Sequence, residues 1–215
     1  MTMRPSPSRR RRTPPAKPQR FKITLTELLW ALIGLLLTIG GTLLKASTTG
    51  LPWTWANGQV PLHFLGVSYQ TGAVMLVGCL GGQNAAVMSQ IAYLALGLAG
   101  FEVFSQGGGL DYLTEPTFGY LLGFVPAAWI CGYIAFKAPP RLESLAFSGL
   151  CGLMVVHTVG ISYLLLSYLL NWLDAASVPL TKALMMYSVT LLPGQVAVIC
   201  AIAVLAYVLR RVMFY

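Results

Sequence analysis

Long apolar runs, each about as long as a membrane-crossing helix, are the feature that most limits how this chain can fold. Few charges interrupt them, because only 9% of the 215 residues are charged while 56% are hydrophobic. Soluble domains carry about 25% charged residues, so this composition, with a mean hydropathy of +0.71, indicates an integral membrane protein. In a bilayer such a chain accommodates about six helices of about 20 residues with short loops.

The sequence therefore predicts an all-α bundle of six transmembrane helices. A capping-box pattern, Thr24-x-x-Glu27, precedes the first, and a tight glycine turn at 81–84 joins the second to the third. Pro116 is tolerated in the first turn of the fourth span, and Pro193 interrupts the sixth. The predicted spans are about 28–44, 65–80, from the glycine turn to 101, 116–136, 144–170 and 183–209.

Basic residues are distributed unevenly along the chain. Eight of the fourteen lie in residues 1–22, which are rich in Arg and Pro and which we interpret as a disordered cytoplasmic arm ahead of one membrane domain, 23–215. With six spans, both termini lie on a side that carries twelve basic residues, and the other side has only Lys45 and Lys182. The positive-inside rule then predicts cytoplasmic N and C termini in a multi-pass protein of the cell (inner) membrane. The basic arm would face membrane lipid rather than nucleic acid.

The most unusual local sequence lies between the third and fourth spans. Gly107, Gly108 and Gly109 are consecutive, and Pro116-Thr117 leads directly into an apolar run. Irregular backbone at the mouth of a membrane helix lines cavities. The predicted orientation puts this loop outside, where a solute would arrive.

These residues resemble the signature of a known family. Gly-Gly-Gly followed by Pro-Thr-x-Gly-Tyr-Leu-x-Gly-Phe at 116–124 looks like the BioY family, the biotin-binding S components of energy-coupling-factor (ECF) transporters. Val-Ser-Tyr-Gln-Thr at 67–71 is similar to that family's Val-Thr-x-Gln-Thr, and the resemblance covers about residues 60–135. It implies biotin uptake, with energy supplied by a separate ECF transmembrane subunit and two ATPase subunits.

The resemblance and the side-chain chemistry together predict a biotin site at the outer mouth. Glycines let backbone amides approach a ligand closely, and Gln and Thr side chains supply donors and acceptors for a ureido group. A tyrosine ring would cover the apolar rings of biotin. The predicted substrate-binding residues are Gln70, Gly107, Gly108, Gly109, Tyr112, Thr117, Tyr120 and Gln195.

The sixth span departs from the family pattern. Family members usually carry Pro-Gly-Asp-x-x-Lys there, and the Asp and Lys help to hold the ligand, whereas this chain reads Pro-Gly-Gln-Val-Ala-Val from Pro193 to Val198. An arginine common at the turn between spans two and three is replaced by Asn84. Lys45 and Lys182 are then the only outer cations available to the carboxylate of biotin.

Small residues recur every four positions on the first span, at Gly34, Thr38 and Thr42. S components dock on their transmembrane partner through a small-xxx-small face of this helix, so the resemblance implies a partner interface here. Packing within the protein's own bundle is an equally supported alternative.

Other functions have weaker support in the sequence. It contains no Walker A, GxSxG or HExxH motif, so we expect no enzyme, no ATPase of its own and no cofactor. The four cysteines lie in apolar runs without metal-ligand spacing, so no metal site is expected. His157 is interpreted as a packing residue, with a functional role as the minority alternative. An S component for another vitamin stays open, as does a membrane enzyme or assembly factor using Asp111 and Glu115.

Overall fold

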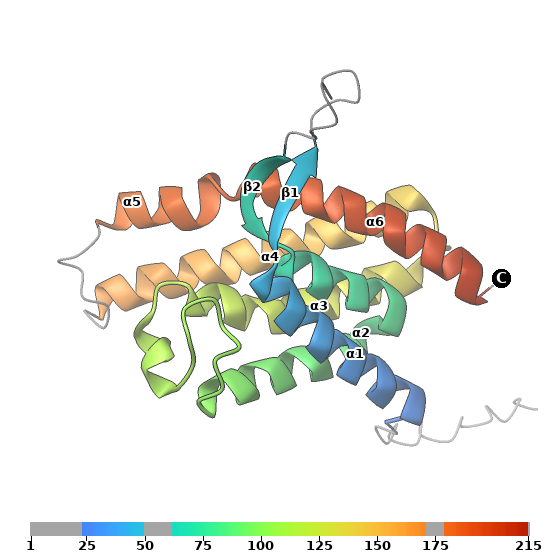
Figure 1. The fold of residues 1–215 in the computed structure, drawn as a ribbon, viewed down its shortest axis with the longest axis horizontal. Helices are drawn as coiled ribbons and strands as arrows, with labels where there is room; N and C mark the ends of the chain where they lie inside the picture. Colours follow the sequence, from blue (N-terminus) through green and yellow to red (C-terminus); the bar gives the residue numbers. More distant parts are fainter. Residues whose placement is uncertain (1–22, 50–61, 171–178, 215) are drawn as a thin grey trace, which may run out of the picture.

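The computed structural model describes residues 23–49, 62–170 and 179–214. Most of these residues are helical (Figure 1), and five of the helices described are long and apolar enough to cross a membrane. The predicted arm at 1–22 and the middle of the loop after the first span lie outside the described residues. The helices are α1 (Leu25–Leu43), α2 (Gln70–Leu98), α3 (Phe118–Lys137), α4 (Leu142–Leu169), α5 (Leu180–Leu184) and α6 (Leu192–Phe214), with a 3₁₀ helix η2 (Leu110–Thr114) and a π-helical stretch η3 (Met185–Val189).

The first helix begins where the sequence predicts. Thr24 is the N-cap of α1, and its hydroxyl accepts a hydrogen bond from the Glu27 backbone N–H at 3.2 Å. The Glu27 carboxylate accepts in return from the Thr24 backbone N–H at 2.9 Å. The capping box predicted from the sequence is therefore confirmed, and two of the amides that a helix start leaves unpaired are satisfied.

The second helix is a hairpin rather than one rod. Gly82 has φ +79° and ψ 177°, which breaks the helical backbone of α2. The Gln70 Nε2 group donates to the Tyr93 hydroxyl at 2.9 Å, although residues so far apart in a continuous helix would be about 35 Å from each other. Figure 1 shows the chain reversing inside α2. The predicted turn thus separates two antiparallel legs, residues 70–81 and 83–98.

A small sheet corrects the all-α prediction. β1 (Lys45–Thr49) pairs antiparallel with β2 (Leu62–Ser68), and Lys45 lies opposite Ser68. Three of the five residues of β1 are Ser or Thr, and Thr favours extended backbone. In β2, Gly66 has φ +72°, a conformation that favours glycine. The second helix begins at Gln70, the residue near which the sequence predicts its start, and the first residues of the predicted span 65–80 belong to β2 instead.

The predicted interruption of the sixth span lies just before Pro193. α5 continues into η3, whose π-type turn closes with a 3.0 Å bond from the Thr190 N–H to the Met185 carbonyl. α6 then starts at Leu192, so Pro193 occupies a first-turn position where its missing N–H leaves no helical bond unmade.

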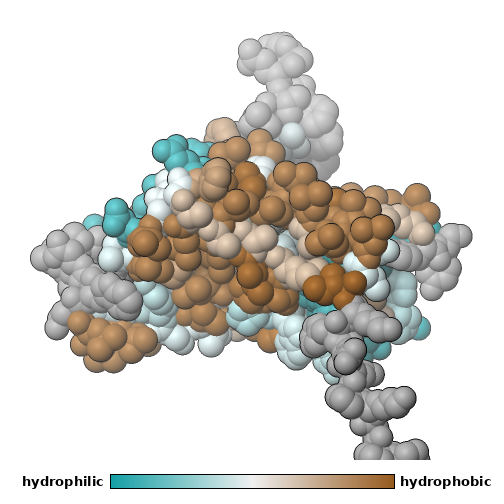
Figure 2. All heavy atoms as spheres, turned by 90° about the horizontal axis from the view of Figure 1, so that it is seen from below, coloured by the Kyte–Doolittle hydropathy of each residue, from teal (hydrophilic) through white to brown (hydrophobic). Residues whose placement is uncertain are grey.

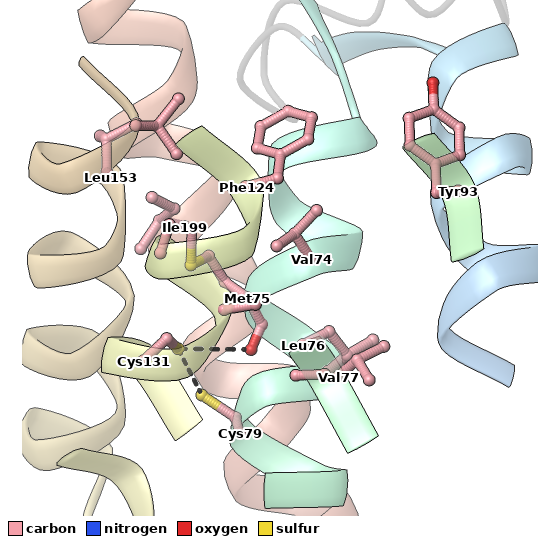
Figure 3. Packing of buried hydrophobic residues seen from close by; sticks show 14 of the residues in the cluster. Val74, Met75, Leu76, Val77, Cys79, Tyr93, Phe124, Cys131, Leu153 and Ile199 are labelled. Atoms are coloured by element: carbon pink, nitrogen blue, oxygen red, sulfur yellow. Dashed lines mark hydrogen bonds between the residues drawn. The ribbon is translucent and has the colours of Figure 1, made fainter. Parts of the chain in front are cut away.

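Four helices meet in the core, as Figure 3 shows. Met75 and Cys79 from α2, Cys131 from α3, Leu153 from α4 and Ile199 from α6 are each at most 2% exposed. The Cys131 thiol lies 3.6 Å from the Met75 carbonyl and 3.8 Å from the Cys79 sulfur, and both cysteines are free thiols. These two cysteines act as small buried side chains, as expected for apolar runs.

The small-residue stripe of α1 faces inward, which corrects its interpretation as a docking surface. Thr38 is fully buried, and its hydroxyl accepts from the Gln90 side chain at 3.1 Å. A Cβ added at Gly34 would lie 2.8 Å from both Val77 and Ser89, so α1 approaches α2 closely at this point. Internal packing, the alternative that the sequence left open, therefore describes this stripe.

The outward surface is apolar. Leu28, Leu32 and Leu36 of α1 are each more than half exposed, and Figure 2 shows hydrophobic side chains across most of the face in view. In water a patch of this size would mark an interaction surface. Together with helices of spanning length, it identifies a multi-pass membrane protein.

Candidate functional site

One large cavity opens between the β-hairpin, the start of α2, α3, α6 and the loop between α2 and η2 (residues 99–109, the glycine loop), which lines it through Phe104 and Ser105. Its volume is about 840 Å³, within the range of small-molecule sites, about 300–1,000 Å³. Its lining is mixed, with aromatic side chains such as Phe104 and Phe124 beside a few polar groups. We call the end of the bundle around this cavity the cavity end.

Five of the eight predicted substrate-binding residues line this cavity, although they come from four separate segments. Gln70 begins α2, Tyr112 lies in η2, Thr117 and Tyr120 lie at the start of α3, and Gln195 lies in the first turns of α6. The structure thus brings together residues that are up to 125 positions apart in the sequence.

The three glycines of the loop do not line the cavity, and they shape its wall instead. Gly107 and Gly109 have φ of +116° and +102°, which favours glycine. The Gly109 N–H donates to the Gly97 carbonyl at 2.7 Å, and a Cβ on Gly108 would collide with the Phe101 carbonyl. The loop is therefore held against the end of α2, and this contact positions the aromatic residues on either side of it.

Those aromatic residues form one wall of the cavity. The Tyr112 ring centroid lies 4.7 Å from that of Phe104, and the Tyr112 hydroxyl is 3.1 Å from Thr117 Oγ1. Both groups that polar ligands would meet here are consequently held in place by protein partners. Such pre-organisation lowers the ordering cost of binding.

Tyr120 forms a second wall together with α4 and η3. Its hydroxyl is 2.6 Å from Ser188 Oγ, and its ring packs edge-on against the His157 imidazole, with centroids 5.8 Å apart. Gly160 leaves room for this ring, because a Cβ there would collide with it. The sequence predicted Tyr120 but gave no sign of these partners.

The two glutamines in the cavity are oriented by different neighbours. Gln70 donates its amide to Tyr93, and its side-chain oxygen has no hydrogen-bond partner among the described residues. Gln195 instead uses its oxygen, which lies 2.7 Å from His157 Nε2. Gln70 therefore offers the cavity an acceptor, and Gln195 offers it N–H donors.

Some residues of the cavity were not predicted as substrate-binding. Thr42, placed by the sequence in the docking stripe, and Lys45, noted only as an outer cation, both contribute to the lining, as does Tyr187 of η3. Lys182 is exposed on α5 and does not line the cavity. Position alone could have suggested Lys45, since it directly follows the first apolar run.

Two known proteins illustrate the relatives of this chain in sequence. A protein of Lysinibacillus sphaericus named "Probable biotin transporter BioY" is 37% identical over 121 residues, which are 55% of this chain and 61% of that protein. An uncharacterized 21.2 kDa protein of Cyanophora paradoxa is 30% identical over 149 residues, 69% of this chain and 76% of that protein.

A solved structure has a similar fold. It is the crystal structure of the S-component for biotin from an ECF-type ABC transporter, with a TM-score of 0.63 and 21% identity, and the match covers 88% of this chain and 95% of that one. The BioY family model matches residues 37–214. Because this match takes in most of the chain, including every residue of the cavity, the protein belongs to the BioY family, as the resemblance in its sequence indicated.

Proposed function

We propose that this protein binds biotin in the cavity and serves as the substrate-binding S component for biotin uptake. The observation that carries the proposal is the convergence of Gln70, Tyr120 and Gln195, from three helices, on one cavity of ligand size. The names of related proteins and the fold of the biotin S-component support the same ligand.

The polar groups of the cavity suit a ureido ring. A ureido group has one carbonyl acceptor and two N–H donors, and the cavity offers N–H donors from Gln195 and an acceptor from Gln70. Phe104, Phe124 and Tyr120 supply apolar and aromatic surface for the fused rings. A ureido ring placed between the two glutamines would give each of them a hydrogen-bond partner, and a buried polar group left without one would weaken binding.

The carboxylate of biotin would lie at the mouth, near Lys45. Lys45 is exposed and lines the cavity. Val198, which stands where the family has Lys, is 3% exposed and packs with Ala46 and Val67 in an apolar cluster. A carboxylate directed toward α6 would therefore meet apolar surface, which is costly for a charge.

The same proposal includes six crossings of the cell membrane with both termini in the cytoplasm. The two legs of α2 count as two crossings, and α5 together with α6 counts as one. This arrangement puts Lys137, Arg141 and the two arginines at the end of α6 on the cytoplasmic side. The cavity then opens outward, and separate ECF transmembrane and ATPase subunits would supply the energy for release.

Titration of the purified protein with biotin, thiamine and riboflavin tests the function directly. We expect saturable binding of biotin with one site per chain, and no binding of the other two vitamins at the same concentrations. Preferential binding of thiamine or riboflavin would make the protein an S component for another vitamin. No binding of any of them by folded protein would overturn the proposal.

A further inference from the structure

His157 is a buried polar side chain that the biotin-binding proposal does not use. It lies on α4, is 5% exposed, and does not line the cavity. Its Nε2 atom is 2.7 Å from the side-chain oxygen of Gln195, and its Nδ1 atom is buried without a hydrogen-bond partner among the described residues. Burying an ionisable side chain inside a membrane protein is costly, so such a residue is a candidate for a functional role.

The chemistry of this contact fixes the direction of the hydrogen bond. An amide oxygen only accepts, so the imidazole must carry its proton on Nε2 and donate. If the amide were turned over, Nε2 would have to accept and the imidazole proton would move to Nδ1, which is buried without a partner among the described residues, and buried N–H groups without a partner are rare and costly. The Gln195 amide is therefore held with its oxygen toward His157. Its two N–H donors have no partner among the described residues, and they are the part of Gln195 left for a ligand in the cavity.

Neighbouring residues hold the imidazole in this position. The edge of the Tyr120 ring packs against it at an interplanar angle of 78°. Tyr120 is itself fixed by Ser188 and by the space that Gly160 leaves. One chain of contacts therefore runs from η3 through α3 and α4 to α6.

We infer that His157 is a positioning residue that makes Gln195 an obligatory donor, so that the ligand must present an acceptor oxygen to α6. This inference rests on the proposed function, because for biotin the acceptor would be the ureido carbonyl oxygen. Gln195 then donates hydrogen bonds to the ligand at the position where the family usually has an aspartate, which only accepts them when it is ionised. A single hydrogen bond between α4 and α6 thus sets which ligand atoms this wall selects.

The first test examines the ligand-free protein and does not depend on biotin. The chain has two histidines, and His63 is exposed and does not line the cavity. A His63→Asn variant labelled with ¹⁵N-histidine therefore reports on His157 alone. We expect the nitrogen resonances to show a proton on Nε2. A proton on Nδ1 alone would overturn the inference, whether or not biotin is the ligand.

The second test compares biotin with 2-iminobiotin, whose protonated guanidinium group has N–H donors and no acceptor oxygen. Wild-type protein should prefer biotin. His157→Phe, which keeps a ring but removes the donor, should reduce the preference about tenfold, the effect of roughly one hydrogen bond. His157→Gln, which can place an N–H near the same point, should restore it, and a purely structural role would not produce that rescue.

A third variant reverses the polarity. Gln195→Glu keeps an acceptor for His157 and gives the cavity a second carboxylate oxygen, so it should prefer 2-iminobiotin over biotin. An unchanged preference in His157→Phe and Gln195→Glu, with normal biotin binding by the wild type, would overturn the inference and leave the proposed function standing. Absence of biotin binding by the wild type would overturn the proposed function, and the ¹⁵N result would then decide the positioning role.

Discussion

The two ends of the contact between α1 and α2 are packed in opposite ways. At one end, Gly34 lets α1 come so close that an added Cβ would lie 2.8 Å from Val77 and Ser89. At the other end, the side chains of Thr42 and Gln70 both form hydrogen bonds with the Tyr93 hydroxyl. Thr42 and Gln70 line the cavity, and Tyr93 lies behind them. The first end, which we call the packed end, is closed by small residues, and the cavity end is held open by hydrogen bonds.

The contact between α3 and α4 repeats this difference. A Cβ at Gly152 would lie 3.3 Å from the Ala127 carbonyl, and neither residue lines the cavity, whereas Gly160 makes room for the large ring of Tyr120, which does line it. Without a hydrophobic force between helices in lipid, close packing of small residues supplies much of the stability. Substitutions at the packed end should therefore change stability first, and substitutions at the cavity end should change binding first.

The largest effect is expected for Gly34→Leu at the packed end. Four extra carbon atoms have no room beside Val77 and Ser89, and overpacking costs about 1–3 kcal/mol or more. Thermal unfolding in detergent should occur at a clearly lower temperature than in the wild type. Gly40→Leu is the matched control on the same helix, because an added Cβ there has no neighbour within 4 Å. A stable Gly34→Leu variant that fails to assemble with a transporter partner would instead restore the docking role.

Tyr120→Ala should separate binding from stability at the cavity end. It removes aromatic cover from the ligand and the hydroxyl contact with Ser188, and we expect biotin affinity to fall by about 2 kcal/mol, or roughly thirtyfold. Tyr120→Phe keeps the ring and should lose much less. Tyr133→Ala, on the exposed side of α3, should leave affinity unchanged. Equal affinity in the wild type and Tyr120→Ala, measured by titration calorimetry, would remove Tyr120 from the site.

The sequence predicted the apolar spans well because their cause is local. The capping box at Thr24 and the turn at Gly82 each depend on a few adjacent residues, and so do the turns that end the other spans. The β-hairpin was missed because the pairing of Lys45 with Ser68 depends on two segments separated by a long loop. A strand next to an apolar run is also difficult to tell from the start of a helix.

For the candidate site, the sequence predicted side chains better than their partners. Gln70 and Gln195 were identified as cavity residues, but their orientation depends on Tyr93 and His157, which are 23 and 38 positions away. No local pattern carries such long-range contacts. The sequence predicted the glycine loop as a ligand contact because flexible backbone suits a ligand contact as well as it suits a packed turn. Only the structure shows that Gly108 packs against Gly97 and Phe101 and that the Gly109 N–H is bonded to the Gly97 carbonyl.

Gly108→Ala tests whether the glycine loop contributes both to stability, as the packed end does, and to ligand binding, as the cavity end does. The added methyl group meets the carbonyls of Phe101 and Gly97, so the loop must shift at a cost of about 1–2 kcal/mol. Because Tyr112 follows the loop, we expect a modest loss of biotin affinity together with a modest loss of thermal stability. Gly40→Ala should change neither property. Loss of affinity with full stability would mean that Gly108 contacts the ligand directly.

The smallest effect is expected at the mouth of the cavity, where charge rather than packing decides. Lys45 lines the cavity and Lys182 does not, but both are exposed, and exposed ion pairs contribute little. Lys45→Ala should therefore weaken biotin binding by less than about tenfold, Lys182→Ala should have no effect, and raising the salt concentration should remove the difference. Biotin amide, which lacks the carboxylate, should bind wild-type protein nearly as well as biotin does and should not respond to Lys45→Ala. A hundredfold loss on removing the carboxylate or Lys45 would place the carboxylate in the buried part of the cavity. The ureido ring would then lie at the mouth, which is the reverse of the orientation that Gln70 and Gln195 favour.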